Sequence, residues 1–504
     1  MGGSTIFLLV LFTAVANGSK CKFHWNGAWT QSGNDFNITY NTFGTLGTCL
    51  HKSRDLYLLS SETSRGTCYR CIITFPVHEN VLHYKKTQCV FDNNVSLKRC
   101  TSIMSAETSM HTLFRKEASS VPCPLEAPLN FTYHSSHGLC SSRTSHINRC
   151  SQHDRLAVHY QACPEIPNKE ASVSQLECIG SWNSYGQQYF AARVAARGGE
   201  QFRCFVLDRV GTSGRIGQSA DASCQELTNI GSASTVLNFK QDLSITPFCE
   251  FSSKLQEDSA IWESMVHGTS HKVDEGTWMS TMKLRNESVW TCLESIVIDK
   301  KTAVYRTHVA HGCETGFQCM KVKFRKQNVI QVEYGEIYQG DEYIDCTDFK
   351  VDNRDVLTIY GSRNPCKLQD KHFSANCPTP VLTSGCNTKY SMQIVNDCAL
   401  PEEDEFTCVA HYEDDGIDFL IVKDLLSRQL ICLTHVASTV KLVRVYDRIS
   451  CDINSVNGAT PMHIFNITNT EACSPSLLAG FLSSSSHLVS SASSLLLPLL
   501  SLLI

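Results

Sequence analysis

Cysteines are the most chemically suggestive residues of this sequence, and Cys68-Tyr-Arg-Cys71 is their closest pair. A C-x-x-C motif beside a helix N-terminus would indicate a redox-active dithiol. Here the motif lies in a strand-like stretch, and no second C-x-x-C or H-x-x-x-H stands at a distance suitable for zinc. We therefore predict that Cys68 and Cys71 are structural half-cystines.

Histidine, serine and acidic residues form no recognisable catalytic or metal-binding pattern. His308 and His311 are three residues apart, but their strand-like flanks would not bring both rings to one face. The string Gly211-Thr-Ser213-Gly214 lacks the spacing of a G-x-S-x-G nucleophile elbow. The acidic runs at 401–405 and 413–415 lack calcium-loop spacing and are expected in solvated loops. We predict no catalytic residue, no metal ligand and no cofactor.

The composition indicates a folded protein outside the reducing cytosol. The chain has 504 residues, of which 42% are hydrophobic and 18% are charged, and its formal net charge is −5. Such a chain can build packed cores over roughly three or four domains. It lacks the basic surface typical of nucleic-acid binding. Its 26 cysteines are numerous for a cytosolic protein, and their even number permits complete disulfide pairing.

Both ends of the chain carry predicted targeting signals. Residues 1–18 are predicted to be a signal peptide, because an apolar run at 4–16 is followed by small residues. Residues 474–504 form a Ser-rich spacer and an apolar tail, the pattern of a glycosylphosphatidylinositol (GPI) attachment signal. The predicted attachment residues are Ser483, Ser484 and Ser485. The alternative is a single-pass transmembrane anchor over 488–504, which several serines and Pro498 weaken.

Five N-x-S/T sequons agree with a protein that lies outside the cell. The predicted GPI lipid would hold it at the cell surface, in the outer leaflet of the plasma membrane. Single sequons occur by chance, but together with a signal peptide they predict surface glycosylation. The predicted glycosylation sites are Asn37, Asn94, Asn130, Asn286 and Asn466.

Short β-branched and aromatic runs, separated by turn residues, predict a mainly β protein. Runs such as 68–75, 202–210 and 289–298 recur at intervals of roughly 8–15 residues, which favours antiparallel sandwiches or barrels. Minor helix is expected near 103–118 and 252–266. A polar segment at 101–122 without cysteine is expected to be a linker.

A Gly-x-Trp tripeptide occurs three times and suggests an internal repeat. Each is followed by a strand with a central cysteine, and a fourth such strand surrounds Cys408. The interpretation is one sheet-rich unit in which a Trp plugs the core and a disulfide ties the facing strand. An alternative is a lipocalin-like barrel with a cavity for a small apolar ligand. The predicted core tryptophans are Trp29, Trp182 and Trp278.

Cysteine spacing divides the ectodomain into four predicted modules, at 21–105, 120–245, 246–370 and 371–473. Two of the blocks hold odd numbers of cysteines, which implies a misplaced boundary or a disulfide between modules. The assignments of Cys249 and Cys377 remain open at this point. Structural half-cystines are predicted at Cys21, Cys49, Cys68, Cys71, Cys89, Cys100, Cys178, Cys204, Cys292, Cys408 and Cys432.

The sequence resembles a group of uncharacterised invertebrate cell-surface proteins built from tandem cysteine-rich domains of unknown function. The resemblance is carried by Cys21-x-Phe23-x-Trp25-x-Gly27-x-Trp29 and by His78-x-Asn80-Val81-Leu82-x-Tyr84 in the first module. In the second module it is carried by Cys123-Pro124, Cys163-Pro164 and the segment from Cys178 to Phe205. It implies a signal peptide, a disulfide-linked ectodomain and a membrane-attached C-terminus, and it supplies no catalytic residue or ligand.

Three functions follow from these patterns. The first is a non-enzymatic GPI-anchored receptor, adhesion or ligand-binding ectodomain that presents stable modules to an extracellular protein. The second is a carrier of small apolar ligands, and the third is an ectoenzyme whose site is assembled from distant residues. Attachment to the membrane is expected through the lipid, and nucleic acid is not an expected partner.

Overall fold

The computed structural model describes residues 21–473 apart from 93, 106, 136–137, 167–169, 185, 197–198, 225–226, 242–244, 298, 340–342, 369, 375–380 and 397–401. The predicted signal peptide and the predicted attachment signal, with Ser483, Ser484 and Ser485, lie outside the described residues. Among the residues described, no helix combines the length and apolar character needed to cross a bilayer.

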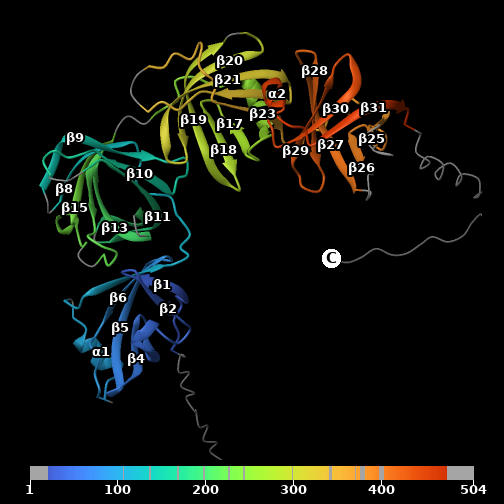
Figure 1. The fold of residues 1–504 in the computed structure, drawn as a ribbon. Coiled ribbons are helices and arrows are strands. Elements are labelled where there is room, and N and C mark those ends of the chain that lie inside the picture. Colours follow the sequence, from blue (N-terminus) through green and yellow to red (C-terminus); the bar gives the residue numbers. More distant parts are fainter. Residues whose placement is uncertain are drawn as a thin grey trace, which may run out of the picture. The chain divides into compact units, whose positions relative to one another are not determined.

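The architecture is almost entirely antiparallel β-sheet, which confirms the predicted mainly β fold (Figure 1). Sheet 1 contains seven strands in the order β2-β1-β7-β6-β5-β4-β3. Its elements are β1 (Gly27–Gln31), β2 (Asn34–Ile38), η1 (Gly44–Leu46), β3 (Thr48–Ser53), β4 (Leu56–Thr63), β5 (Gly66–His78), β6 (Val81–Lys86), α1 (Leu97–Ile103) and β7 (Met110–Arg115).

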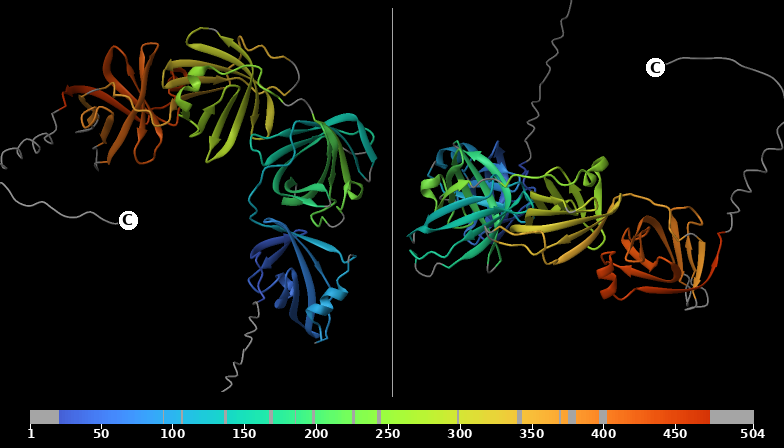
Figure 2. Two further views of the ribbon diagram at one scale, coloured as in Figure 1. Left: turned by 180° about the vertical axis from the view of Figure 1, so that it is seen from behind. Right: turned by 90° about the horizontal axis from the view of Figure 1, so that it is seen from above.

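Three closed barrels follow, each with its strands in chain order around the ring (Figure 2). Barrel 2 contains β8 (Leu129–Ser135), β9 (Gly138–Arg149), β10 (Arg155–Tyr160), β11 (Ser172–Ser184), β12 (Gln187–Ala196), β13 (Gly199–Val210), β14 (Ser213–Gln218), η2 (Ile230–Ser232) and β15 (Thr235–Gln241). Barrel 3 contains η3 (Ser253–Leu255), η4 (Glu257–Ser259), β16 (Ile261–Ser264), β17 (Ser270–Val273), β18 (Thr277–Met282), β19 (Arg285–Val297), β20 (Thr302–His311), β21 (Glu314–Lys326), β22 (Val329–Tyr334) and β23 (Asn353–Ile359). Barrel 4 contains β24 (Asp370–Ser374), β25 (Val381–Ser384), β26 (Ser391–Asn396), β27 (Glu402–Asp414), β28 (Ile417–Asp424), β29 (Leu430–Val436), β30 (Thr439–Asp447), α2 (Ile453–Gly458) and β31 (His463–Glu471).

The chain divides into two compact units. The first unit contains sheet 1, barrel 2 and residues 285–289 and 308–316. The second unit contains the rest of barrel 3 and barrel 4.

Strand alternation builds both the barrel cores and the joins between neighbours. Successive side chains of a strand face opposite sides of the sheet. On β28, Leu420 and Val422 belong to the interior cluster of barrel 4. Phe419 and Ile421 on the same strand pack in a cluster that includes Val329 of barrel 3. One face of β28 therefore packs in the core of barrel 4, and its other face packs against barrel 3.

Two disulfides recur at equivalent places in all three barrels. One joins a cysteine ahead of the first strand to the fourth strand, in Cys123–Cys178, Cys249–Cys292 and Cys366–Cys408. The other joins the sixth strand to the segment between the seventh and eighth strands, in Cys204–Cys224, Cys319–Cys346 and Cys432–Cys451. A repeated unit is therefore present, but the predicted alignment was wrong, because Cys204 lies on a sixth strand whereas Cys292 and Cys408 lie on fourth strands.

The Gly-x-Trp tripeptides do not mark equivalent positions. Trp29 lies on the first strand of its sheet, Trp182 on the fourth strand of barrel 2 and Trp278 on the third strand of barrel 3. Trp29 and Trp278 are fully buried, whereas Trp182 is half-buried and packs outside the barrel core. The prediction of three equivalent core plugs was therefore wrong, since a tripeptide is too short to identify a strand.

A buried tryptophan on the first strand is the feature that sheet 1 and barrel 3 share. Trp29 on β1 donates its indole N–H to the carbonyl of Trp25 at 2.9 Å. Trp262 on β16 donates in the same way to the carbonyl of Leu255 at 3.0 Å, and it is 1% exposed. In both cases the ring closes the core against the segment that precedes the first strand.

The predictions of two helices and of a linker were also wrong. Residues 110–115 form β7, which pairs with β1 and β6, so sheet 1 continues through the segment expected to be a linker. Near 252–266 the structure has the short 3-10 helices η3 and η4, followed by β16. The consecutive residues Leu113 and Phe114 of β7 bury opposite faces of the strand in two different clusters, and this packing determines that the segment is a strand.

The disulfides explain the odd cysteine counts. Cys150 of barrel 2 pairs with Cys313 in the turn between β20 and β21. Cys249 pairs within barrel 3. Cys366, which the predicted boundary at 370/371 placed in the third module, pairs with Cys408 of barrel 4. Cys377 lies outside the described residues.

Candidate functional site

The interior of barrel 2 contains a small apolar cavity. Its volume is about 90 Å³, and Leu125, Phe190 and Phe205 are among the residues that line it. A cavity of about 150 Å³ holds benzene, and drug-sized ligands occupy about 300–1,000 Å³. The cavity is therefore too small for a fatty acid or a similar apolar cargo.

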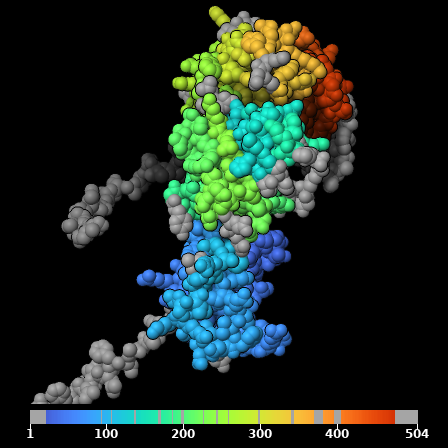
Figure 3. Space-filling model, turned by 90° about the vertical axis from the view of Figure 1, so that its left-hand side faces the viewer, coloured from blue at the N-terminus to red at the C-terminus, as the bar shows by residue number. Residues whose placement is uncertain are grey.

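A larger concavity lies where sheet 1 meets barrel 2, within the first unit. The two pack through an apolar seam that includes Val81 and Phe114 of sheet 1 and Ile179, Tyr189 and Phe202 of barrel 2. The rings of Phe114 and Phe202 are stacked, with centroids 4.7 Å apart and an interplanar angle of 6°. Figure 3 shows one face of this unit, with sheet 1 in blue next to barrel 2 in cyan and green.

Hydrogen bonds and a close backbone approach fix the seam. The side-chain amide of Asn80 donates to the carbonyls of Ser119 and Ile179, both at 2.8 Å. A Cβ at Gly180 would lie 2.9 Å from the His78 ring, so only glycine permits this approach. The Gly180-x-Trp182 tripeptide thus serves the seam rather than the barrel core.

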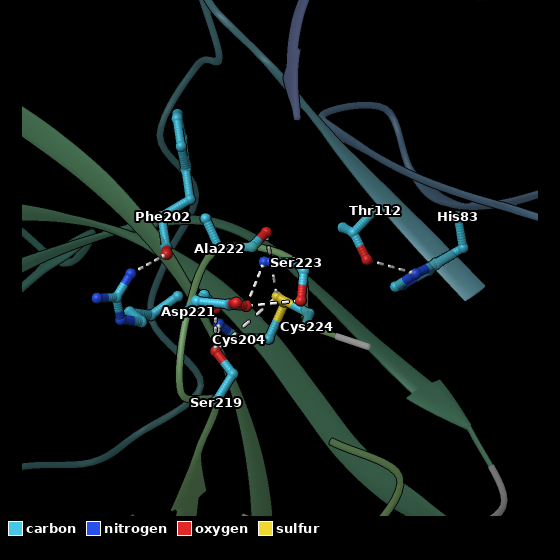
Figure 4. Close-up of a disulfide and its surroundings, with 10 residues drawn as sticks. His83, Thr112, Phe202, Cys204, Ser219, Asp221, Ala222, Ser223 and Cys224 are labelled. Carbon is cyan, nitrogen blue, oxygen red and sulfur yellow. Dashed lines mark hydrogen bonds between the residues drawn. A yellow bond between two sulfur atoms is a disulfide. The ribbon is translucent and has the colours of Figure 1, made fainter. Parts of the chain in front are cut away.

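His83 lies half-buried at the same seam. Its Nδ1 lies 3.1 Å from the Thr112 hydroxyl. Figure 4 shows the two side chains facing each other. The ring also contacts the edge of Trp182 at a centroid distance of 5.6 Å, and Trp182 stacks on Tyr189 at 5.9 Å. Burial lowers the pKa of His83 to about 4, so the imidazole is neutral at pH 7.

A groove of about 720 Å³ opens beside this seam. Its volume falls within the range of small-ligand sites. Sheet 1 contributes Asp35 and Lys116, which form an ion pair at 2.6 Å. Barrel 2 contributes Arg203 and Asp221. Each wall of the groove therefore carries one cation and one carboxylate.

The barrel 2 wall is held in place by a disulfide loop (Figure 4). Cys224 pairs with Cys204 on β13, and Ser219 donates its hydroxyl hydrogen to the carbonyl of Asp221 at 2.8 Å. The Asp221 carboxylate accepts hydrogen bonds from the Ser223 hydroxyl at 2.6 Å and the Ser223 N–H at 2.7 Å. These bonds, together with the Arg203 charge, hold the pKa of Asp221 below its ordinary value.

The residues that line the groove are mainly charged, polar and small. None of the residues that line it is histidine or cysteine. Asp221 stays ionised at neutral pH, so it is a poor proton donor. The Thr30 hydroxyl donates to the carbonyl of Asn34 at 3.2 Å. Fixed charges of both signs can instead pair with a polar ligand.

The structure shows the exposure of the five sequon asparagines and the pairing of the eleven predicted half-cystines. Four sequon asparagines are exposed: Asn37 on β2, Asn94 in a turn, Asn130 on β8 and Asn466 on β31. Asn286 on β19 is half-buried, and its carbonyl accepts a hydrogen bond from Ser151 at 3.0 Å. All eleven predicted half-cystines are disulfide-bonded: Cys21–Cys49, Cys68–Cys89, Cys71–Cys100, Cys178–Cys123, Cys204–Cys224, Cys292–Cys249, Cys408–Cys366 and Cys432–Cys451.

Sequence reasoning missed the groove residues. Asp35, Lys116, Arg203 and Asp221 are scattered over the first half of the chain and form no motif. The one relevant residue in the sequence was Gly180, which marks a close approach between the barrel 2 backbone and His78. Only the pairing of sheet 1 with barrel 2 brings these residues together.

Family comparisons agree with a tandem organisation. Three family models match the chain, each described as a domain of unknown function: DUF7044 at residues 19–105, DUF7042 at 119–241 and DUF7043 at 245–358. A search of curated proteins found no match. The chain is thus built from tandem domains of unknown function, as the resemblance in its sequence predicted, and its many disulfides indicate an extracellular or secreted protein.

Proposed function

We propose that this protein is a GPI-anchored ectodomain that binds an extracellular partner, without catalysis, in the groove between sheet 1 and barrel 2. The observation that carries the proposal is the groove itself, with its volume of about 720 Å³ and its charged side chains on both walls. Binding sites commonly form where two rigid elements meet. The seam and the disulfide loop hold both walls in place, so little ordering entropy is lost on binding.

The carrier function receives less support from the same structure. A lipid carrier needs an enclosed space of several hundred cubic ångströms. The cavity of barrel 2 is about 90 Å³, and its interior is filled by rings such as Phe190 and Phe205, which stack at 4.6 Å. Partner recognition on the outside of barrel 2 agrees better with this packing.

An interaction screen with single-residue variants tests the groove. The ectodomain would be screened against extracellular proteins and lipids to identify a partner. The affinity of this partner would then be measured for the Arg203→Ala and Lys116→Ala variants. Each variant should weaken binding about tenfold or more, because each removes a charge-assisted contact. Arg215→Ala, which removes an exposed ion pair with Asp208 outside the groove, is the matched control. Unchanged affinity in both groove variants would exclude the groove as the binding site.

The anchor is tested separately on cells. Phosphatidylinositol-specific phospholipase C should release the protein from the surface if a GPI lipid holds it. A known GPI-anchored protein on the same cells shows that the lipase is active. Retention of this protein under those conditions would indicate a transmembrane tail.

A further inference from the structure

A second group of polar side chains gathers at one end of barrel 4, in the second unit. Leu420 on β28 and Leu433 on β29 belong to the interior cluster. Asp418 precedes Leu420 by two residues and His435 follows Leu433 by two, so both face the same interior. Asp418 is 0% exposed and His435 is 4% exposed. The two strands therefore place a carboxylate and an imidazole at the mouth of an otherwise apolar barrel.

Basic groups from three other segments surround this mouth. Lys367, next to the Cys366–Cys408 disulfide, donates from its Nζ to a carboxylate oxygen of Asp418. His411 lies on β27 next to Tyr412 of the outer face and opposite Leu420 of the interior. Its Nε2 accepts a hydrogen bond from Lys326 Nζ at 2.9 Å.

The position of Lys326 is fixed by its neighbours at the end of β21. The Arg325 guanidinium forms two hydrogen bonds with the Asp414 carboxylate of barrel 4, at 3.0 and 2.7 Å. The Asn328 amide donates to the carbonyl of Val409 at 3.1 Å. These bonds fix the chain on both sides of Lys326, whose exposed side chain reaches the His411 ring.

Positive charge exceeds negative charge within this cluster. Among the described residues, Lys326 has no carboxylate within ion-pair distance, and Asp418 is already bonded to Lys367. Burial and the nearby Lys367 charge lower the pKa of Lys326. Burial, followed by the Lys326 and Lys367 charges, lowers the pKa of His411. An anion at this place would offset the repulsion between the basic groups.

Two buried acceptors at the mouth lack donors. His435 uses its Nδ1–H for the carbonyl of Val436 at 2.9 Å, which leaves Nε2 as an acceptor. This Nε2 and Asp418 Oδ2 lie 3.7 Å apart, and neither has a hydrogen-bond partner in the described part of the chain. Unpaired buried polar atoms are costly, so the site is suited to a ligand that brings hydroxyl hydrogens.

We propose that the mouth of barrel 4 binds an acidic saccharide. Lys326, Lys367 and His411 hold its sulfate or carboxylate group, and Asp418 and His435 accept hydrogen bonds from its hydroxyl groups. This site is independent of the groove in the first unit, because it uses none of the same residues.

Calorimetry on the complete ectodomain tests the proposal with four probes: N-acetylglucosamine 6-sulfate, glucuronic acid, inorganic sulfate and glucose. The two acidic sugars should bind more tightly than inorganic sulfate, and glucose should not bind measurably. Equal affinity for inorganic sulfate and the sulfated sugar would refute the role of the hydroxyl groups. Absence of binding by both acidic sugars would overturn the site.

Matched variants locate the binding on this cluster. Lys326→Gln should weaken the acidic sugars about tenfold or more, the usual effect of losing one charged hydrogen bond. Lys321→Gln, on the same strand but over Phe349, is the control and should leave affinity unchanged. Nuclear magnetic resonance of the His411 ring gives a second readout, since a bound anion should raise its pKa. A sugar that binds without moving this titration would place the site elsewhere and overturn the assignment.

Discussion

Asp355 on β23 is a buried acid that should make the stability of barrel 3 depend on pH. Its side chain is 2% exposed, and its Oδ2 accepts a hydrogen bond from the Ser264 hydroxyl at 2.5 Å. Its Oδ1 has no hydrogen-bond partner among the described residues. Burial raises the pKa of Asp355 from 3.8 to about 7, an effect that the Ser264 hydrogen bond only partly offsets.

The size of the effect follows from linkage between proton binding and folding. One pKa unit corresponds to about 1.4 kcal/mol, so a rise of about three units corresponds to about 4 kcal/mol. Because the folded state binds this proton more tightly, the stabilisation is complete below about pH 4 and is lost as pH rises through 7. Asp355→Asn keeps an acceptor for Ser264 but cannot ionise. The variant should be more stable than the native protein by up to about 4 kcal/mol at pH 8, and similar to it at pH 4.

Urea unfolding followed by tryptophan fluorescence measures this difference. Barrel 3 contains Trp262, Trp278 and Trp290, which are half of the six tryptophans of the chain. Asp352→Asn changes an exposed carboxylate near the start of the same strand and should leave the pH profile unchanged. If Asp355→Asn and the native protein show parallel stability profiles between pH 4 and pH 8, the carboxyl is not desolvated and the reasoning fails.

Three further outcomes are expected. Burial holds the pKa of His83 near 4, so the seam between sheet 1 and barrel 2 is stable above pH 6.5 and weakens as pH falls toward 4. Between pH 7.4 and pH 5 its opening equilibrium should rise about 25-fold, seen as faster hydrogen exchange in β6 and β7, and His83→Gln should abolish this dependence. Trp262→Ala should cost barrel 3 about 3–5 kcal/mol in urea unfolding, whereas Trp182→Ala should leave barrel 3 unchanged. Gly180→Ala should weaken the seam by about 1–3 kcal/mol in the same hydrogen-exchange measurement, because its Cβ would meet the His78 ring at 2.9 Å.

The cysteines made the modular fold predictable from sequence, whereas the Gly-x-Trp tripeptides led to a wrong alignment of the modules. Spacing placed Cys204, Cys292 and Cys408 in strands, and all three lie in strands. The sequence could not show which of these cysteines occupy the same strand of the repeated barrel, because the fourth and the sixth strands both carry a buried cysteine at their centre. Trp262 was missed because Ala260 stands where the tripeptide requires glycine, although its indole makes the bond that matters.

The candidate sites were not predictable, and the reason is geometric. Asp35 and Arg203 lie 168 positions apart in the sequence, and Lys326 and Asp418 lie 92 positions apart. Each pair meets only because neighbouring modules pack through the outer faces of their strands. Without a motif, the sequence predicts which faces of the strands are apolar, but it does not predict which two outer faces pack together.

Both sites border such joins, because little space remains in the core of a closed barrel. Its inward side chains fill the core, as Phe190 and Leu420 do, and no strand edge remains to bind a peptide. Apolar outward side chains such as Phe202 and Phe419 are used where one module packs on the next. Charged residues then remain at the rims of these joins, where burial on one side strengthens their interactions. Within each unit, recognition should therefore require both neighbouring modules, and a single excised module should lose it.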